Sequence, residues 1–205
     1  SYIYLYGDMD MAEKLIWMDE HYLSHFDKME IDSTLALQKP FDKPVTVCKD
    51  YPVMEGESLE DNTYLSYNAV VGTSLDKELY YAMQIIDYAV CSASGAPLKL
   101  ALIHKNIGTE VYSIYENGIY QPYFSIVAKN ANAVQKDEFV ATIEDELARI
   151  VKEGLDKKAL LAGLNYYEFK YREADFGSYP KGLMYGLQMF DSWLYDDNMP
   201  FDMIE

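Results

Sequence analysis

The sequence has 205 residues, half of them hydrophobic, and its 34 acidic against 17 basic residues give a formal net charge of −17. Such a field repels phosphate backbones, so nucleic acid is excluded as a partner, and no apolar run reaches the roughly 18 residues of a membrane span. Cys48 and Cys91 fit neither a disulfide framework nor a thiolate zinc site, and no basic segment precedes an apolar run at the start. We therefore expect a globular protein of the reducing cytoplasm.

The first part of the chain combines a strand, a helix and an irregular segment. Aromatic and β-branched residues at 2–6 predict a strand, and apolar residues recur at helical spacing over 11–26. Prolines and an acidic turn-rich stretch then interrupt the pattern over 31–62, within which residues 45–49 form one candidate strand.

Three parts follow from this pattern. We expect residues 1–30 to be the terminal strand and helix of a preceding domain, 31–62 to be a linker, and 63–205 to be one complete domain.

Regular elements return after the linker. Residues 63–72 predict a largely buried strand, and Ser74 or Asp76 caps the helix that follows. Pro97 begins a second short helix that Gly108 ends. The predicted apolar stripe of the first helix is Leu79, Met83, Ile86 and Val90.

An Asn-Gly pair at 117–118 lies between two strand-like runs and predicts a β-hairpin with a two-residue turn. That register pairs Tyr115 with Tyr120 and Val111 with Phe124 on the face that points to the core.

Three amphipathic helices complete the chain, with Gly154, Asp156 and Pro180 near their ends. Their apolar stripes are Phe139, Ile143, Leu147 and Ile150, then Leu160, Leu164, Tyr167 and Tyr171, then Leu183, Leu187, Phe190 and Leu194. The order of elements predicts an α+β fold, a two-layer domain whose mainly antiparallel sheet is covered by helices on one face.

Four segments in this order carry a resemblance to a known family: "YIYLYGDMDMAEKLIWMDEHYLSHFDK", "LSYNAVVGTSLDKELYYAMQIIDYAVCSASGAPLKLALIHKNIG", "FSIVAKN" and "EFKYREADFGSYPKGLMYGLQMFDSWLYDD". The chain resembles bacterial presequence proteases, which belong to the pitrilysin and insulinase class of zinc metallopeptidases. The resemblance implies the fold of mitochondrial processing peptidase-like metallohydrolases, with four related α+β domains around a peptide. It places this chain at the end of the first domain and in the non-catalytic second domain.

The histidines at 21 and 25 do not form the zinc motif of that family. The motif is H-x-x-E-H, in which the glutamate activates water. Here Ser24 stands where the glutamate is needed, and His104 gives no third ligand that we can place. We therefore consider His21 and His25 and reject them as metal ligands. The resemblance implies zinc in the full-length parent and no cofactor in this fragment.

The resemblance also gives a candidate substrate site. In insulin-degrading relatives, the strand entering the hairpin offers a backbone edge to which a peptide adds as a strand. The matching residues here are Tyr112, Ser113, Ile114, Tyr115 and Glu116. They lack the paired glycines of those relatives, and an ordinary hairpin strand is the alternative interpretation.

These observations predict a non-catalytic structural and substrate-chamber domain of an oligopeptide-degrading zinc metalloendopeptidase. The chain alone lacks H-x-x-E-H and is expected to be inactive, and its partners are the other domains of the parent and unstructured peptides. The alternative is a stand-alone module that binds peptides or a partner subunit; a carbohydrate module is a third choice suggested by the 20 tyrosines. The strand at 2–6 predicts either dimerisation or docking on the strand at 45–49.

Overall fold

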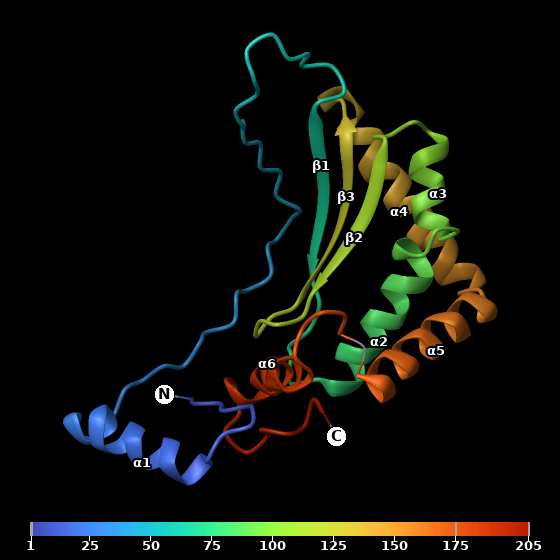
Figure 1. Cartoon of the computed structure of the whole chain (residues 1–205). Coiled ribbons are helices and arrows are strands. Elements are labelled where there is room, and N and C mark those ends of the chain that lie inside the picture. The colour runs from blue at the N-terminus through green and yellow to red at the C-terminus, as the bar shows by residue number, and fades with distance from the viewer. Residues whose placement is uncertain (1, 175, 205) are drawn as a thin grey trace.

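The computed structural model describes residues 2–174 and 176–204. Its centre is an antiparallel sheet in the order β1-β3-β2, with β3 in the middle (Figure 1). The strands are β1 (Thr63–Val70), β2 (Glu110–Glu116) and β3 (Tyr123–Ala131). The helices beside the sheet are α2 (Lys77–Asp87), α3 (Pro97–His104), α4 (Lys136–Glu153) and α5 (Lys157–Glu173). The predicted α+β fold is confirmed, with helices on one face of an antiparallel sheet.

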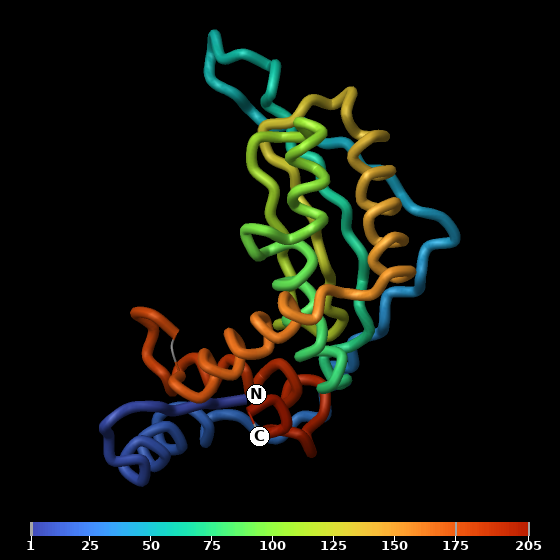
Figure 2. The backbone as a smooth tube through the Cα atoms, turned by 90° about the vertical axis from the view of Figure 1, so that its right-hand side faces the viewer, coloured from blue at the N-terminus to red at the C-terminus, as the bar shows by residue number. Residues whose placement is uncertain are grey.

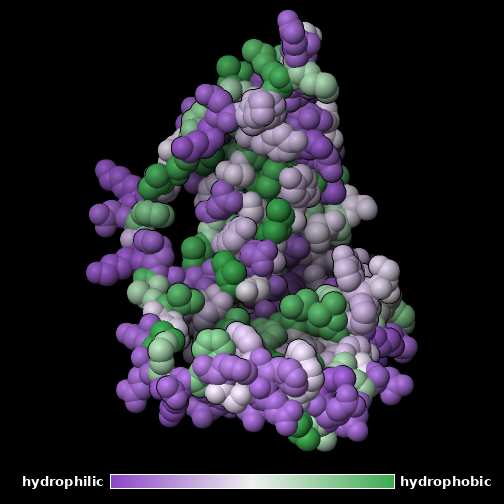
Figure 3. Space-filling view, turned by 60° about the vertical axis from the view of Figure 1, so that its left-hand side comes forward, coloured by the Kyte–Doolittle hydropathy of each residue, from purple (hydrophilic) through white to green (hydrophobic). Residues whose placement is uncertain are grey.

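The main core lies between the sheet and the helices α3 and α4. Side chains alternate along each strand, so Leu65, Val111 and Ile126 point to the same face, where all three are buried. From the helices, Leu102 and Phe139 meet them and are fully buried. Among the described residues, no helix lies over the opposite face, although Ser125 and Val127 of β3 are buried there. Figure 3, which brings the side of β1 forward, shows hydrophobic residues scattered among hydrophilic ones.

Local signals place the helix ends correctly. The Asp76 and Asp156 carboxylates accept hydrogen bonds from the third residue of α2 and α5, over 3.0 and 2.8 Å. Gly154 follows α4 with a φ of 85°, which glycine adopts without strain. Ser74, the other proposed cap, is fully buried and its hydroxyl has no partner among the described residues.

The buried face of α2 differs from the predicted apolar stripe. Tyr80, Gln84 and Asp87 are its buried residues, whereas Leu79 and Met83 are half-buried. The reason is that α2 packs against α5 as well as the sheet, and the side chains that face it there are polar and aromatic.

From Lys77 to His104 the chain is long and apolar enough by composition to cross a membrane. Core helices of globular proteins can be equally long and apolar. Leu98 and Leu102 from this stretch are fully buried in the protein core, and 39% of its most apolar 18-residue window is buried inside the protein. A single π-helical segment, Tyr88–Ser92, joins α2 to the turn before α3.

The predicted hairpin register is wrong. Tyr115 pairs with Phe124 and Val111 with Ala128, so six residues connect the strands instead of two. The two-residue turn would put Pro122 inside β3, which is hydrogen-bonded on both edges, and proline has no N–H to give. Pro122 instead precedes β3, and its carbonyl accepts from the Val71 N–H over 2.8 Å.

Within the described residues, neither 2–6 nor 45–49 pairs in a sheet, so the predicted docking of one on the other is wrong. Residues 2–6 run along α6 (Lys181–Trp193), as Figure 2 shows, instead of docking on 45–49. The Tyr4 hydroxyl donates to the Gly182 carbonyl over 2.7 Å. Aromatic side chains hold this segment in place, so no ladder is needed.

That contact decides which face of α6 is buried. Its buried residues are Gly182, Gly186, Met189 and Ser192. The predicted stripe is largely exposed, with Leu183, Leu187 and Leu194 between 43 and 51% accessible. In α5 the only buried residue is Gly163, and Leu164, which we expected inside, is 47% exposed.

The helix α1 (Met11–His21) has no buried residue, and residues 23–61 are exposed throughout. On α1, the side chains of Leu15, Ile16 and Trp17 are 56–58% accessible. The linker touches the domain at the hairpin loop, where the Gln38 N–H donates to the Gln121 side chain over 2.6 Å.

Candidate functional site

The proposed substrate residues, Tyr112–Glu116, lie on β2, the outer strand of the sheet. Within residues 2–174 and 176–204, no strand pairs with the outer edge of β2. Ile114, on the face away from the helices, is 41% exposed. The strand therefore offers unpaired backbone groups to an extended chain.

The inward side chains of β2 are fixed by α2. The Ser113 hydroxyl donates a hydrogen bond to the Asp87 carboxylate. Burial raises the pKa of Asp87, although this hydrogen bond opposes the shift. The Tyr115 ring meets the Tyr80 ring edge-on at 6.5 Å between centroids.

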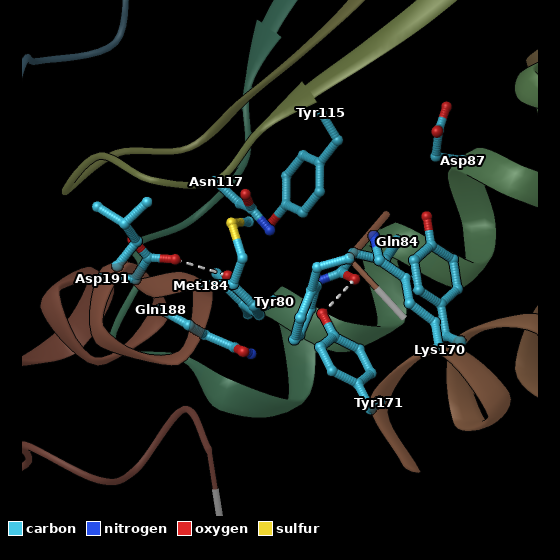
Figure 4. Close-up of a pocket in the computed structure, with 13 residues that line it drawn as sticks. Tyr80, Gln84, Asp87, Tyr115, Asn117, Lys170, Tyr171, Met184, Gln188 and Asp191 are labelled. Atoms are coloured by element: carbon cyan, nitrogen blue, oxygen red, sulfur yellow. Dashed lines mark hydrogen bonds between the residues drawn. The ribbon is translucent and has the colours of Figure 1, made fainter. Parts of the chain in front are cut away.

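A cavity of about 320 Å³ opens at the end of β2 and is walled by α2, α5 and α6 (Figure 4). We call it the tyrosine pocket, after the four tyrosines that line it: Tyr80, Tyr115, Tyr167 and Tyr171. From the sequence, Tyr115 was expected to face the core and Tyr167 and Tyr171 to lie in an apolar helix stripe, and the pocket was not predicted.

One end of the tyrosine pocket is acidic. The Tyr80 hydroxyl donates to Asp191 Oδ2 over 2.7 Å. Burial raises the pKa of Asp191 to about 6, with a further contribution from the charge of Glu116, while the Tyr80 hydrogen bond opposes the shift. Asp191 Oδ1 accepts no hydrogen bond within the described part of the chain.

The middle of the tyrosine pocket contains an unsatisfied donor. The Tyr171 hydroxyl donates to Gln84 Oε1 over 3.0 Å, which leaves Gln84 Nε2 without a partner among the described residues. Gln84 is only 7% exposed, and an unpaired buried amide costs about 1–3 kcal/mol. A ligand with an acceptor oxygen would satisfy this group.

The histidines considered as metal ligands lie far from the tyrosine pocket, on and just after α1. His21 Nδ1 is 3.0 Å from the Trp17 carbonyl, and its ring stacks on the Trp17 ring. His25 lies in the exposed turn that follows. No group of three or more His, Cys, Asp or Glu side chains among the described residues could hold a metal ion, so the residues present do not fit a zinc centre.

Comparison with known proteins decides the family. The family model of the peptidase M16 inactive domain matches residues 1–166. The chain belongs to the peptidase M16 inactive-domain family. It is thus a non-catalytic peptidase domain, and the resemblance to presequence proteases is confirmed by the relatives below.

Protein HypA of Clostridium perfringens is 39% identical to this M16 domain over 96% of the chain and 20% of HypA. Presequence protease 1 of Arabidopsis thaliana is 29% identical over 99% of the chain and 19% of that protein. The chain therefore spans about a fifth of the length of these curated relatives. The fold matches the inactive peptidase domain of a protein assigned as a zinc protease from Bordetella parapertussis, with a TM-score of 0.56 and 8% identity over 69% of this chain and 75% of that one.

Proposed function

We propose that this M16 inactive domain holds unstructured peptides for a larger zinc-dependent peptidase whose zinc and water-activating residues lie outside this chain. Two findings support the division of labour. The described residues contain no group of metal ligands, and the chain matches only about a fifth of relatives that are named as proteases. In this assignment the parent works in the cytoplasm. The chain lines the substrate chamber and binds the peptide, and it does not perform hydrolysis.

The proposed peptide-binding site is the outer edge of β2. An extended peptide adds there as a further antiparallel or parallel strand, hydrogen-bonded to the backbone of Tyr112–Glu116. The observation that carries this proposal is that β2 is the outer strand and that its edge has no partner strand among the described residues. Backbone hydrogen bonding tolerates many sequences, as a peptide-degrading enzyme requires.

The first 30 residues are assigned to a preceding domain of the parent. The exposed apolar side chains of α1, among them Ile16 and Trp17, need a surface to cover them. Dimerisation through residues 2–6 is a second way to satisfy the unpaired backbone there. Sedimentation of the purified chain distinguishes docking on a preceding domain from dimerisation. Dimerisation through residues 2–6 doubles the sedimenting mass at micromolar concentration, and removal of these residues restores the monomer.

Binding and cleavage of one fluorescent unstructured peptide test the proposal. We expect the purified chain to bind the peptide, leave it intact, contain far less than one zinc ion per chain, and respond to no chelator. A peptide with the same side chains but alternate N-methylated amides should bind much more weakly, because it lacks donors for the edge of β2. Chelator-sensitive cleavage by pure protein, or equal binding of the N-methylated peptide, would contradict the proposal.

A further inference from the structure

The tyrosine pocket has an acidic end that the fold does not neutralise. Asp191 Oδ2 is occupied by the Tyr80 hydroxyl, but Oδ1 has no donor in the described part of the chain. Among the salt bridges of the described residues, none involves Asp191. The Asp191 carboxylate is half-buried, and a cation with N–H donors is the group that best pairs with its remaining oxygen.

The walls suit a cation as well. Tyrosine ring faces attract ammonium and guanidinium groups within about 6 Å of the ring centre. The pocket already contains one such contact, because Lys170 Nζ lies 5.8 Å from the centroid of the Tyr167 ring. In Figure 4, Lys170 and Asp191 lie at opposite ends, so Lys170 does not occupy the acidic end.

A second, independent feature points to a ligand. Gln84 lines the same cavity, and its buried Nε2 has no partner within the described ranges. The pocket thus presents an unused acceptor at Asp191 and an unused donor at Gln84. A molecule with a cationic group and a carbonyl oxygen would satisfy both, as an arginine or lysine residue does.

We propose that the tyrosine pocket binds an organic cation, a guanidinium or ammonium group, with Asp191 as its counter-ion and the tyrosine rings as its walls. The source is either a basic residue of a peptide or a free small amine, which share this chemistry. The inference does not depend on strand addition at β2, because the only part of β2 that lines the pocket is the inward side chain of Tyr115, and the ligand needs no extended backbone.

Three small probes distinguish these sources by chemical-shift mapping on the isotope-labelled chain. N-acetyl-arginine N-methylamide carries one cation and carbonyls, its citrulline analogue is neutral with a similar shape, and N-propylguanidine carries the same single cation without a carbonyl. We expect the arginine probe to bind at least about tenfold more tightly than the citrulline probe, because ionic hydrogen bonds are roughly twice as strong as neutral ones. Binding of N-propylguanidine equal to that of the arginine probe identifies a free small cation as sufficient, whereas much weaker binding identifies an amino-acid residue.

Protonation gives a second readout. The titratable groups that face Asp191 are Tyr80, Tyr81, Glu116, Tyr171 and Tyr195. The pKa values of these tyrosines are raised, so they stay neutral near pH 7. The pKa of Asp191 is raised to about 6, so affinity for the arginine probe should fall about tenfold between pH 7.5 and pH 5 as the carboxylate takes up a proton.

Substitution completes the test. Asp191→Asn keeps an acceptor for Tyr80 but removes the charge, and should weaken the arginine probe about tenfold and abolish the pH dependence. Asp145→Asn, on the exposed side of α4, is the matched control and should change neither. Tyr115→Leu removes a pocket wall and should weaken binding several-fold, which tests the pocket independently of the charge of Asp191.

Equal affinity for the arginine and citrulline probes would overturn the inference. So would wild-type affinity in either pocket variant, or shifts confined to residues outside the pocket. These results are distinct from a failure of strand addition, which is measured with the N-methylated peptide and leaves the small probes unaffected.

Discussion

The Tyr80 hydroxyl donates a 2.7 Å hydrogen bond to Oδ2 of Asp191, joining α2 to α6 across 111 positions of the sequence. A second link between distant helices, from the Tyr171 hydroxyl to Gln84 Oε1, joins α5 to α2. These polar contacts tie together the three helices around the tyrosine pocket. They lie outside the apolar core under the sheet, so the helices beside the pocket depend on hydrogen bonds as well as on apolar burial.

Asp191→Asn is predicted to stabilise the chain at neutral pH. The pKa of Asp191 is about 6 in the folded chain against 3.8 as a reference, so the folded state holds this proton more tightly. The contribution of Asp191 to the stability of the folded chain is therefore most favourable below pH 4, and it is lost as the pH rises through 6. After a discount for the partial exposure of the carboxyl, we expect a gain of about 1–2 kcal/mol at pH 7.5 that disappears towards pH 4. Urea unfolding of wild type and variant at both pH values measures it, and a gain independent of pH would refute this explanation.

Gly108→Ala is predicted to destabilise the domain. Gly108 has a φ of 72°, and an added Cβ would lie 2.6 Å from the carbonyl oxygen of Lys129 on the central strand. The left-handed backbone alone costs an alanine roughly 1–2 kcal/mol, and the contact adds to it. We expect a loss of about 2–3 kcal/mol in the free energy of unfolding. Gly95→Ala, whose Cβ meets nothing within 4 Å, is the control, and an equal loss there would count against this explanation.

Gly186→Ala is predicted to detach the N-terminal segment without unfolding the domain. An added Cβ would overlap the Tyr4 ring, which packs on this glycine. Alanine also favours the helix by about 1 kcal/mol relative to glycine, so α6 itself should not weaken. Amide exchange should become faster at residues 3–6 while the urea midpoint stays the same or rises. Leu183→Ala, at an exposed position of the same helix, should leave exchange at residues 3–6 unchanged.

Ile114→Lys is predicted to weaken peptide binding at β2. Ile114 is 41% exposed, so the fold tolerates lysine there, and lysine on an edge strand discourages further strand pairing. Val151→Lys makes the same exchange on α4, where valine is 85% exposed, and controls for the added charge. Peptide affinity measured by fluorescence anisotropy should fall several-fold only in the Ile114 variant. A similar fall in both variants would mean that net charge, and not the edge, determines binding.

Local signals were sufficient for the element order and for several helix ends. Asp76, Asp156 and Gly154 act within one turn of the backbone, so their residue types predict their structural roles. The hairpin register was not predictable from the Asn-Gly pair alone. It depends on β3 lying between two strands, which excludes Pro122 from the ladder, and that is a property of the whole sheet.

Helix faces were mispredicted where the neighbouring surface is not apolar. α6 buries Gly182 and Gly186 because tyrosines from the start of the chain pack on them. α2 buries Gln84 because Tyr171 meets it from a helix 87 positions away. The tyrosine pocket was missed for the same reason, since its residues come from four elements. The available signal was the polar spacing of Gln84 and Asp87 within an otherwise apolar helix.

In the proposed function, this M16 inactive domain holds an extended peptide along the edge of β2 without cleaving it. Hydrogen exchange of the purified chain, followed by mass spectrometry with and without a saturating unstructured peptide, tests it most directly. We expect slower exchange at residues 112–116, little change on α4, and a peptide recovered at its full mass. Unchanged exchange at residues 112–116 with bound peptide, or recovery of the peptide in fragments, would contradict it.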